Sequence, residues 1–97
     1  MQFMLLGYDG KDGNALGRRL AARERHLELG DQLAAEGKLH FAAAILDTEG
    51  TMIGSMLALE FPSRAEFDAW LTIEPYVTGD VWREIEISPV RIARSAK

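Results

Sequence analysis

The chain has 97 residues, of which 47% are hydrophobic and 27% charged, and its formal net charge is -4 at pH 7. This is typical of one globular domain, and the negative charge argues against a nucleic-acid-binding protein, which needs a basic surface to neutralise phosphates. The absence of cysteine excludes disulfides, thiolate metal sites and a cysteine nucleophile, and it fits a reducing cytoplasm.

The N-terminal third predicts a strand followed by a long helix. An apolar run over residues 2–8 reads as the strand, and a cluster of turn-forming residues follows over 9–13. The helix is expected to have Asn14 as its N-cap and to run to about Glu36, because Gly37 is suited to end it. The first eleven residues lack the pattern of a signal peptide, and their apolar run is too short to span a membrane. We therefore expect a cytoplasmic protein that does not bind membranes.

The middle of the chain predicts a hairpin and a second helix. Residues 38–47 and 51–61 read as strands that are joined by a turn of polar residues and glycine, so they are expected to pair. The second helix is predicted over 64–73, with Ser63 as N-cap and Glu66 as its partner in a capping box.

The remaining segments predict a loop, a fourth strand and a tail. Residues 74–80 read as a loop because Pro75 stops the helix, residues 81–93 read as a strand, and disorder is expected from about Arg94. The order βαββαβ places both helices on one face of a four-stranded antiparallel sheet. This is a ferredoxin-like α+β plait, formed by a single domain over residues 1–97.

The other face of the sheet is predicted to be apolar as well. The first strand directs Met4, Leu6 and Tyr8 away from Phe3 and Leu5, and the third strand is similarly apolar on both sides. A second copy of the sheet is the simplest cover, so we expect a homodimer that forms an α/β barrel. The alternative is a monomer with an exposed apolar face. Polar and apolar residues alternate convincingly only in the fourth strand. One side of that strand is expected to carry Trp82, Glu84, Glu86 and Ser88.

Polar residues interrupt the apolar arc of the first helix. Arg19, Arg23, His26 and Gly30 fall near the middle of the arc, and their spacings of four, three and four place them in one row. Glycine in a helix costs about 1 kcal/mol relative to alanine, so Gly30 indicates a close approach by a backbone or a ligand. The arc itself is formed by Leu16, Leu20, Ala22, Leu27, Leu29, Leu33 and Ala34.

A charge inside an apolar arc has to be paired or to border a wet cavity, because unpaired burial costs several kcal/mol. One interpretation is that the arginines reach the edge of the arc and His26 bonds a core carbonyl. The other, which we favour, is a pocket for a small anionic or enolisable ligand, since guanidinium groups hold oxygens and an imidazole transfers protons.

Two carboxylates are candidates to orient His26: Asp9 at the end of the first strand, and Glu74. Asp9 is equally suited to forming a turn with Gly10. His40 has no evident partner and is expected to be structural. With two histidines and no cysteine, no spacing resembles a metal site, and we expect no metal or organic cofactor.

Three segments together resemble the YCII-related (YciI-like) family: MLLGYDG, RRLAARERHLELGDQLAAEGKL and GSMLALEFPSRAEFDAWLTIEPYVTGDVWREIEISPVR. The resemblance implies a dimeric α/β barrel of ferredoxin-like protomers, and an enzyme whose histidine works with a carboxylate. It implies His26, Asp9 and Glu74 as catalytic residues, with Glu74 one methylene longer than the family's usual aspartate. It matches Arg23 and Tyr76 to family positions and includes Ser55 in one of its motifs. With Arg19 from the helical row, the residues expected to bind the substrate are Arg19, Arg23, Ser55 and Tyr76.

Two functions follow from these expectations. The first is a cofactor-independent enzyme that carries out isomerisation or elimination beside a carbonyl group of a small metabolite. The second is a non-catalytic domain that binds a ligand or serves as an accessory dimer.

Overall fold

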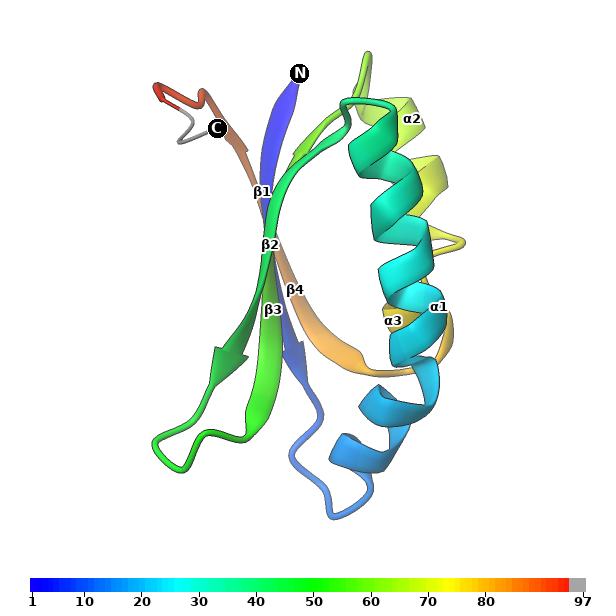
Figure 1. Ribbon diagram of the computed structural model, residues 1–97, viewed down its shortest axis with the longest axis vertical. Helices are drawn as coiled ribbons and strands as arrows, with labels where there is room; N and C mark the ends of the chain where they lie inside the picture. Colours follow the sequence, from blue (N-terminus) through cyan, green and yellow to red (C-terminus); the bar gives the residue numbers. More distant parts are fainter. Residues whose placement is uncertain (95–97) are drawn as a thin grey trace.

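The computed structural model describes residues 1–94 as a two-layer α+β fold. Four antiparallel strands form one sheet in the order β2-β3-β1-β4, and the helices cover one of its faces (Figure 1). The predicted ferredoxin-like plait is confirmed. The predicted disordered tail falls mainly on residues 95–97, which lie outside the described residues. In chain order the elements are β1 (Gln2–Asp9), α1 (Ala15–Ala35), β2 (Leu39–Leu46), β3 (Met52–Glu60), α2 (Arg64–Leu71), α3 (Pro75–Thr78) and β4 (Trp82–Val90).

The core lies between the sheet and the helices. Side chains on β1 alternate between buried and partly exposed, which is the pattern of a strand with one fully covered face. Burial of these apolar side chains is the main force that holds the two layers together. The largest buried apolar side chains come from β1, β3, α2, α3 and the residue before β4, and they include Phe3, Leu5, Leu59, Phe67, Tyr76 and Val81.

The helix ends agree with the sequence in part. Gly37 follows α1 with a φ of 74°, and the Ser63 hydroxyl accepts a hydrogen bond from the Glu66 N–H at 3.2 Å, both as predicted. Asn14 does occupy the N-cap position, but its side chain caps nothing. Its φ of -96° and ψ of 0° lie outside the extended region from which a cap side chain reaches back to the helix.

The predicted loop after α2 contains the short helix α3. Pro75 occupies its first turn, where a fixed φ favours the helix and the missing N–H costs nothing. The Glu74 carboxylate caps it by accepting a hydrogen bond from the Tyr76 N–H at 2.9 Å. This turn directs the Tyr76 side chain into the interior, where it is 1% exposed.

The expected alternation along β4 was wrong at Trp82. The pairing with β1 shifts from Tyr8↔Glu84 to Asp9↔Trp82, so one extra residue of β4 is accommodated in a bulge. A bulge breaks the alternation between the residues on its two sides, so that Trp82, before it, no longer faces the same way as Glu84, after it. Trp82 therefore lies on the helix-covered face with an exposure of 4%, while Glu84 is exposed.

The predicted core arc of α1 was too broad. Only one narrow stripe of the helix is buried, and its members are Arg19, Ala22, His26 and Leu33. Leu16, Leu20 and Leu27 are instead 41%, 55% and 46% exposed. A helix that lies across a sheet contacts it along a single line, so the leucines beside that line remain at the surface.

The sheet face without helices carries partly exposed apolar side chains, as predicted. On the central strands they include Met4, Leu6 and Met56. The pairing of two copies through this face stays a prediction. In the described part of the chain, no helix has the apolar length needed to span a bilayer.

Candidate active site

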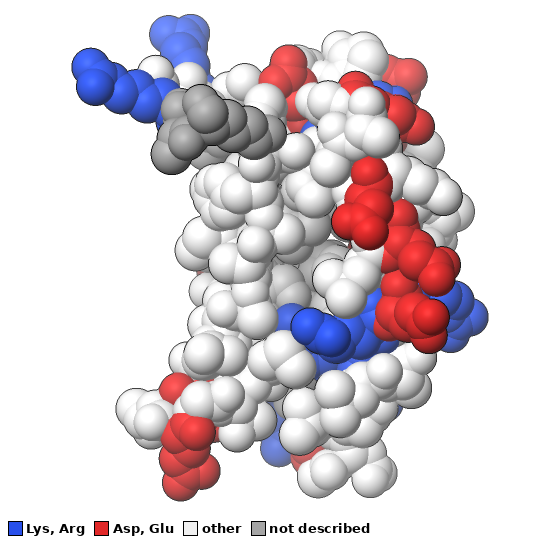
Figure 2. Space-filling view, in the orientation of Figure 1, with Lys and Arg blue, Asp and Glu red and all other residues white. Residues whose placement is uncertain are grey.

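A cavity of about 220 Å³ lies between α1 and the β2–β3 side of the sheet. Figure 2 shows Lys and Arg side chains at the edge of a hollow between the sheet and the helices. The polar residues around the cavity are Arg19, Arg23, His26, Ser55 and Tyr76. The apolar ones are Leu27, Ala42, Ala43, Ala44, Met52 and Leu57.

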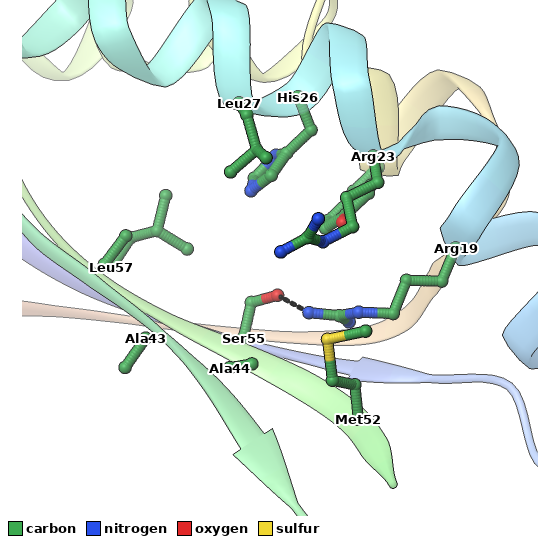
Figure 3. A pocket seen from close by; sticks show the side chains of 11 residues that line it. Arg19, Arg23, His26, Leu27, Ala43, Ala44, Met52, Ser55 and Leu57 are labelled. Atoms are coloured by element: carbon green, nitrogen blue, oxygen red, sulfur yellow. Dashed lines mark hydrogen bonds between the residues drawn. The ribbon is translucent and has the colours of Figure 1, made fainter.

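His26 is held by Glu74 and by the ring of Tyr76. Its Nδ1 lies 2.5 Å from Oε1 of Glu74, the same oxygen that accepts the Tyr76 N–H. The imidazole stacks on the Tyr76 ring with centroids 3.8 Å apart and planes 8° from parallel. Since the carboxylate takes Nδ1, Nε2 is left without a hydrogen-bond partner among residues 1–94, and the imidazole points into the cavity (Figure 3).

The structure resolves which carboxylate reaches His26. Glu74 does, and the extra methylene relative to aspartate does not take it out of reach. Asp9 instead pairs with Arg19, whose Nη1 lies 2.9 and 3.1 Å from its two carboxylate oxygens. Asp9 is therefore neither a free turn residue nor the partner of the histidine.

Arg19 is buried and fully engaged at both terminal nitrogens. Nη2 donates to the carbonyl oxygen of Gly54 at 3.0 Å and to the Ser55 hydroxyl at 2.9 Å, while Nη1 is taken by Asp9. Its charge is neutralised by Asp9, so it contributes little net attraction for a second anion.

Arg23 is the cation that remains available at the cavity. It is exposed, it points into the cavity in Figure 3, and it forms no ion pair with any residue of the described range 1–94. An unpaired guanidinium beside an imidazole favours a ligand with a negative or strongly polarised oxygen. Of the two arginines predicted to bind the ligand, Arg23 alone has free donors at both terminal nitrogens.

Burial raises the pKa of Tyr76 above its usual value of 10.0, and the positive charges of Arg19 and Arg23 oppose this shift. The phenol is therefore neutral at physiological pH and offers a hydroxyl group, not a phenolate, to the cavity that it lines. The stacked ring also covers one face of the imidazole.

Trp82 also belongs to the site, although it was not among the predicted site residues. Its Nε1 donates to the Ser55 hydroxyl at 3.1 Å, and its ring meets the His26 and Tyr76 rings edge-on. The signal for it was Gly7, because a glycine inside a strand is typical of close approach by another group. A Cβ on Gly7 would lie 2.5 Å from the Trp82 ring.

Gly30 does not play the role expected of it. A Cβ there would meet only Leu39 Cδ2, at an ordinary 3.7 Å, so no close approach requires the glycine. His40 does not line the cavity, and its Nε2 lies 2.7 Å from Oε1 of Glu60, a contact consistent with the structural role expected of it. Within residues 1–94, no three His, Asp or Glu side chains are grouped closely enough to hold a metal ion.

The model of the YCII-related domain family matches residues 1–91. An uncharacterized protein of Haemophilus influenzae is 33% identical over 84 residues, which cover 80% of this chain and 86% of that protein. Among solved structures, the 5-chloro-2-hydroxyhydroquinone dehydrochlorinase of Burkholderia phenoliruptrix, in complex with 2,5-dihydroxybenzoquinone, superposes with a TM-score of 0.83. The alignment covers 94% of both chains at 21% identity, so it establishes the shared fold.

Proposed function

The chain belongs to the YCII-related domain family, and we propose that it is an enzyme that moves protons on a small anionic or enolisable metabolite. One observation carries the proposal: Nδ1 of His26 is held by Glu74, while the imidazole points into a cavity that Arg23 also lines. A carboxylate at Nδ1 favours the tautomer whose Nε2 lone pair is free. That is the form a general base requires.

In the proposed reaction, Nε2 of His26 removes a proton from the carbon next to a carbonyl group. The electron pair of the C–H bond forms the C=C bond of an enolate, and the negative charge moves to the carbonyl oxygen. Arg23 then stabilises that oxygen, while Glu74 stabilises the imidazolium. In an isomerisation His26 returns the proton to a different atom, and in an elimination an anion departs from the adjacent carbon.

The size and lining of the cavity support a small ring compound as substrate. A cavity of about 220 Å³ is below the usual range for drug-sized ligands, and its alanine and leucine side chains suit an apolar ring. The dehydrochlorinase that shares this fold acts, by its name, on a hydroxylated aromatic ring, and was solved with a quinone. Loss of hydrogen chloride is an elimination, the second of the two reaction types that we propose.

Two copies are proposed to pair through the uncovered sheet face, where partly exposed Met4, Leu6 and Met56 lie side by side on paired strands. Burial of these side chains against a second copy is favourable in proportion to the apolar area removed from water. Sedimentation at micromolar concentration would check the dimer. We also propose that the protein is located in the cytoplasm, and the only support is that a chain without cysteine fits a reducing compartment.

Hydrogen–deuterium exchange tests the proposed chemistry without knowledge of the product. Small cyclic diketones and 2-oxo acids are incubated with the protein in D2O, and loss of the C–H signal beside the carbonyl is followed by proton NMR. The wild type should accelerate exchange of at least one compound, and His26→Gln should abolish the acceleration with the fold intact.

His40→Gln is the matched control, since His40 does not line the cavity and should leave exchange unchanged. Full activity in His26→Gln would remove the mechanism. Binding of these compounds without any accelerated exchange would instead favour the non-catalytic ligand-binding domain.

A further inference from the structure

The Ser55 hydroxyl is a buried group with an unusual set of neighbours. It lies on β3 at the wall of the cavity, and the residue is 2% exposed. Its Oγ receives two hydrogen bonds, one from Arg19 Nη2 at 2.9 Å and one from Trp82 Nε1 at 3.1 Å. Guanidinium and indole nitrogens only donate, so both bonds use lone pairs of the oxygen.

A serine hydroxyl has two lone pairs and one hydrogen. With both lone pairs occupied, Ser55 interacts with any third group only as a donor. Among residues 1–94 no acceptor takes this hydrogen. A buried donor without a partner is unfavourable, and a ligand oxygen in the cavity would satisfy it.

The two groups that occupy the lone pairs are themselves fixed. Arg19 is anchored by Asp9 and by the carbonyl oxygen of Gly54. Trp82 lies against Gly7, where no larger side chain fits beneath its ring. The hydroxyl is therefore oriented before a ligand binds, which is the condition under which a single donor discriminates strongly between ligands.

We propose that Ser55 is a specificity-determining hydrogen-bond donor that selects ligands with a carbonyl, enolate or phenolate oxygen, and that Trp82 and Arg19 are its positioning residues. The proposal rests on the proposed function for the place where the ligand binds. It concerns recognition and does not require proton transfer. Ammonium groups, which have no lone pair, and aryl amines, whose lone pair is delocalised into the ring, cannot accept this hydrogen bond well and would be disfavoured.

A pair of similar ring compounds tests the selection directly. Pentafluorophenol is ionised at mildly alkaline pH and presents an acceptor oxygen, whereas pentafluoroaniline presents a donor of nearly the same size. Fluorine NMR measures the dissociation constants of both. The wild type should prefer the phenolate, and Ser55→Ala should weaken phenolate binding by about 10- to 100-fold, the loss typical of one hydrogen bond to a charged oxygen. The affinity for the aniline should not fall.

Three further variants separate this role from a structural one. Ser55→Thr keeps the hydroxyl and should keep the preference. Trp82→Phe frees one lone pair, so the preference should fall by less than in Ser55→Ala, and this variant decides the matter if Ser55→Ala does not fold. Thr48→Ala, which removes an exposed hydroxyl in the turn between β2 and β3, away from the cavity lining, should have no effect.

An equal affinity of the wild type for the two compounds would overturn the proposal, as would an equal loss of both in Ser55→Ala. An unchanged preference in Trp82→Phe would overturn the positioning role of that residue. The phenolate preference should persist in His26→Gln. Failure of the proposed catalysis is thus distinguishable from failure of the selection by Ser55.

Discussion

Replacing Asp9 by asparagine tests whether this carboxylate stabilises the fold through Arg19. Both of its oxygens accept hydrogen bonds from Nη1 of Arg19, at 2.9 and 3.1 Å. The two side chains are 4% and 3% exposed. Asparagine has nearly the same shape without the charge, so the change leaves a buried guanidinium without its counterion.

Removing one member of a buried ion pair typically costs about 3–5 kcal/mol, because the remaining charge is uncompensated in a poorly solvated place. A domain of this size has a total stability on the order of 5–15 kcal/mol, so the loss should be a large share of it. The matched control is Asp68→Asn, which breaks the pair of Arg64 and Asp68, whose side chains are 53% and 55% exposed. An exposed pair contributes about 0–1 kcal/mol.

The assay is urea unfolding followed by tryptophan fluorescence at one fixed protein concentration. The midpoint should fall strongly in Asp9→Asn and hardly at all in Asp68→Asn, with similar slopes for all three proteins. A cost for Asp9→Asn of less than about 1 kcal/mol, or one no larger than that of Asp68→Asn, would refute the assigned role.

Three further outcomes follow from the packing and charges of the site. Gly7→Ala should destabilise the fold by about 1–3 kcal/mol and change the tryptophan emission, because its Cβ would lie 2.5–2.7 Å from Trp82 ring atoms. The control is Gly17→Ala, which should be neutral or stabilising because nothing lies within 4 Å of the added Cβ. Equal losses of stability in the two variants would contradict the contact with Trp82. Since burial raises the pKa of Tyr76 above 10.0, the folded chain keeps a proton that the unfolded chain releases. The contribution of the Tyr76 phenol to stability is complete below pH 10.0 and is lost as the pH rises through the pKa of the folded state. Tyr76→Phe should therefore reduce the fall of the urea midpoint with rising alkaline pH. The same fall in wild type and variant would contradict the raised pKa. Arg23→Ala should raise the Michaelis constant of the exchange reaction, and an unchanged constant would exclude Arg23 from ligand binding.

Local sequence patterns were sufficient to predict the fold. The apolar run of β1, the two-strand hairpin and the helix after Ser63 were all predicted and agree with the tertiary structure. The short helix α3 was missed because a single turn carries no periodic signal. It depends on the Glu74 cap and on Pro75, which the sequence shows as turn-forming residues.

The candidate site was predicted as a row of residues but not as a network. Helical spacing correctly indicated that Arg19 and His26 are buried on one side of α1. It could not assign their partners, because Asp9 and Glu74 are both within plausible reach of a helix whose position over the sheet is unknown. In the folded chain α3 lies beside α1, and this places the Glu74 carboxylate in contact with Nδ1 of His26.

Trp82 shows where alternation fails as a guide. A strict period of two places it with Glu84 and Glu86 on the uncovered face, and a single bulge moves it to the other side. Bulges depend on how two strands fit together and leave little trace in one sequence. Gly7 was the only local sign that a large ring had to be accommodated against β1.

The most direct test of the proposed base is the tautomer of each of the two histidines, measured by long-range proton–nitrogen NMR at a pH where both rings are neutral. His26 contacts Glu74 through Nδ1, whereas His40 contacts Glu60 through Nε2. We predict opposite tautomers, with the proton on Nδ1 in His26 and on Nε2 in His40, and a change for His26 alone in Glu74→Gln. A His26 ring that carries its proton on Nε2 would have no lone pair to offer the cavity, and that result would contradict the account.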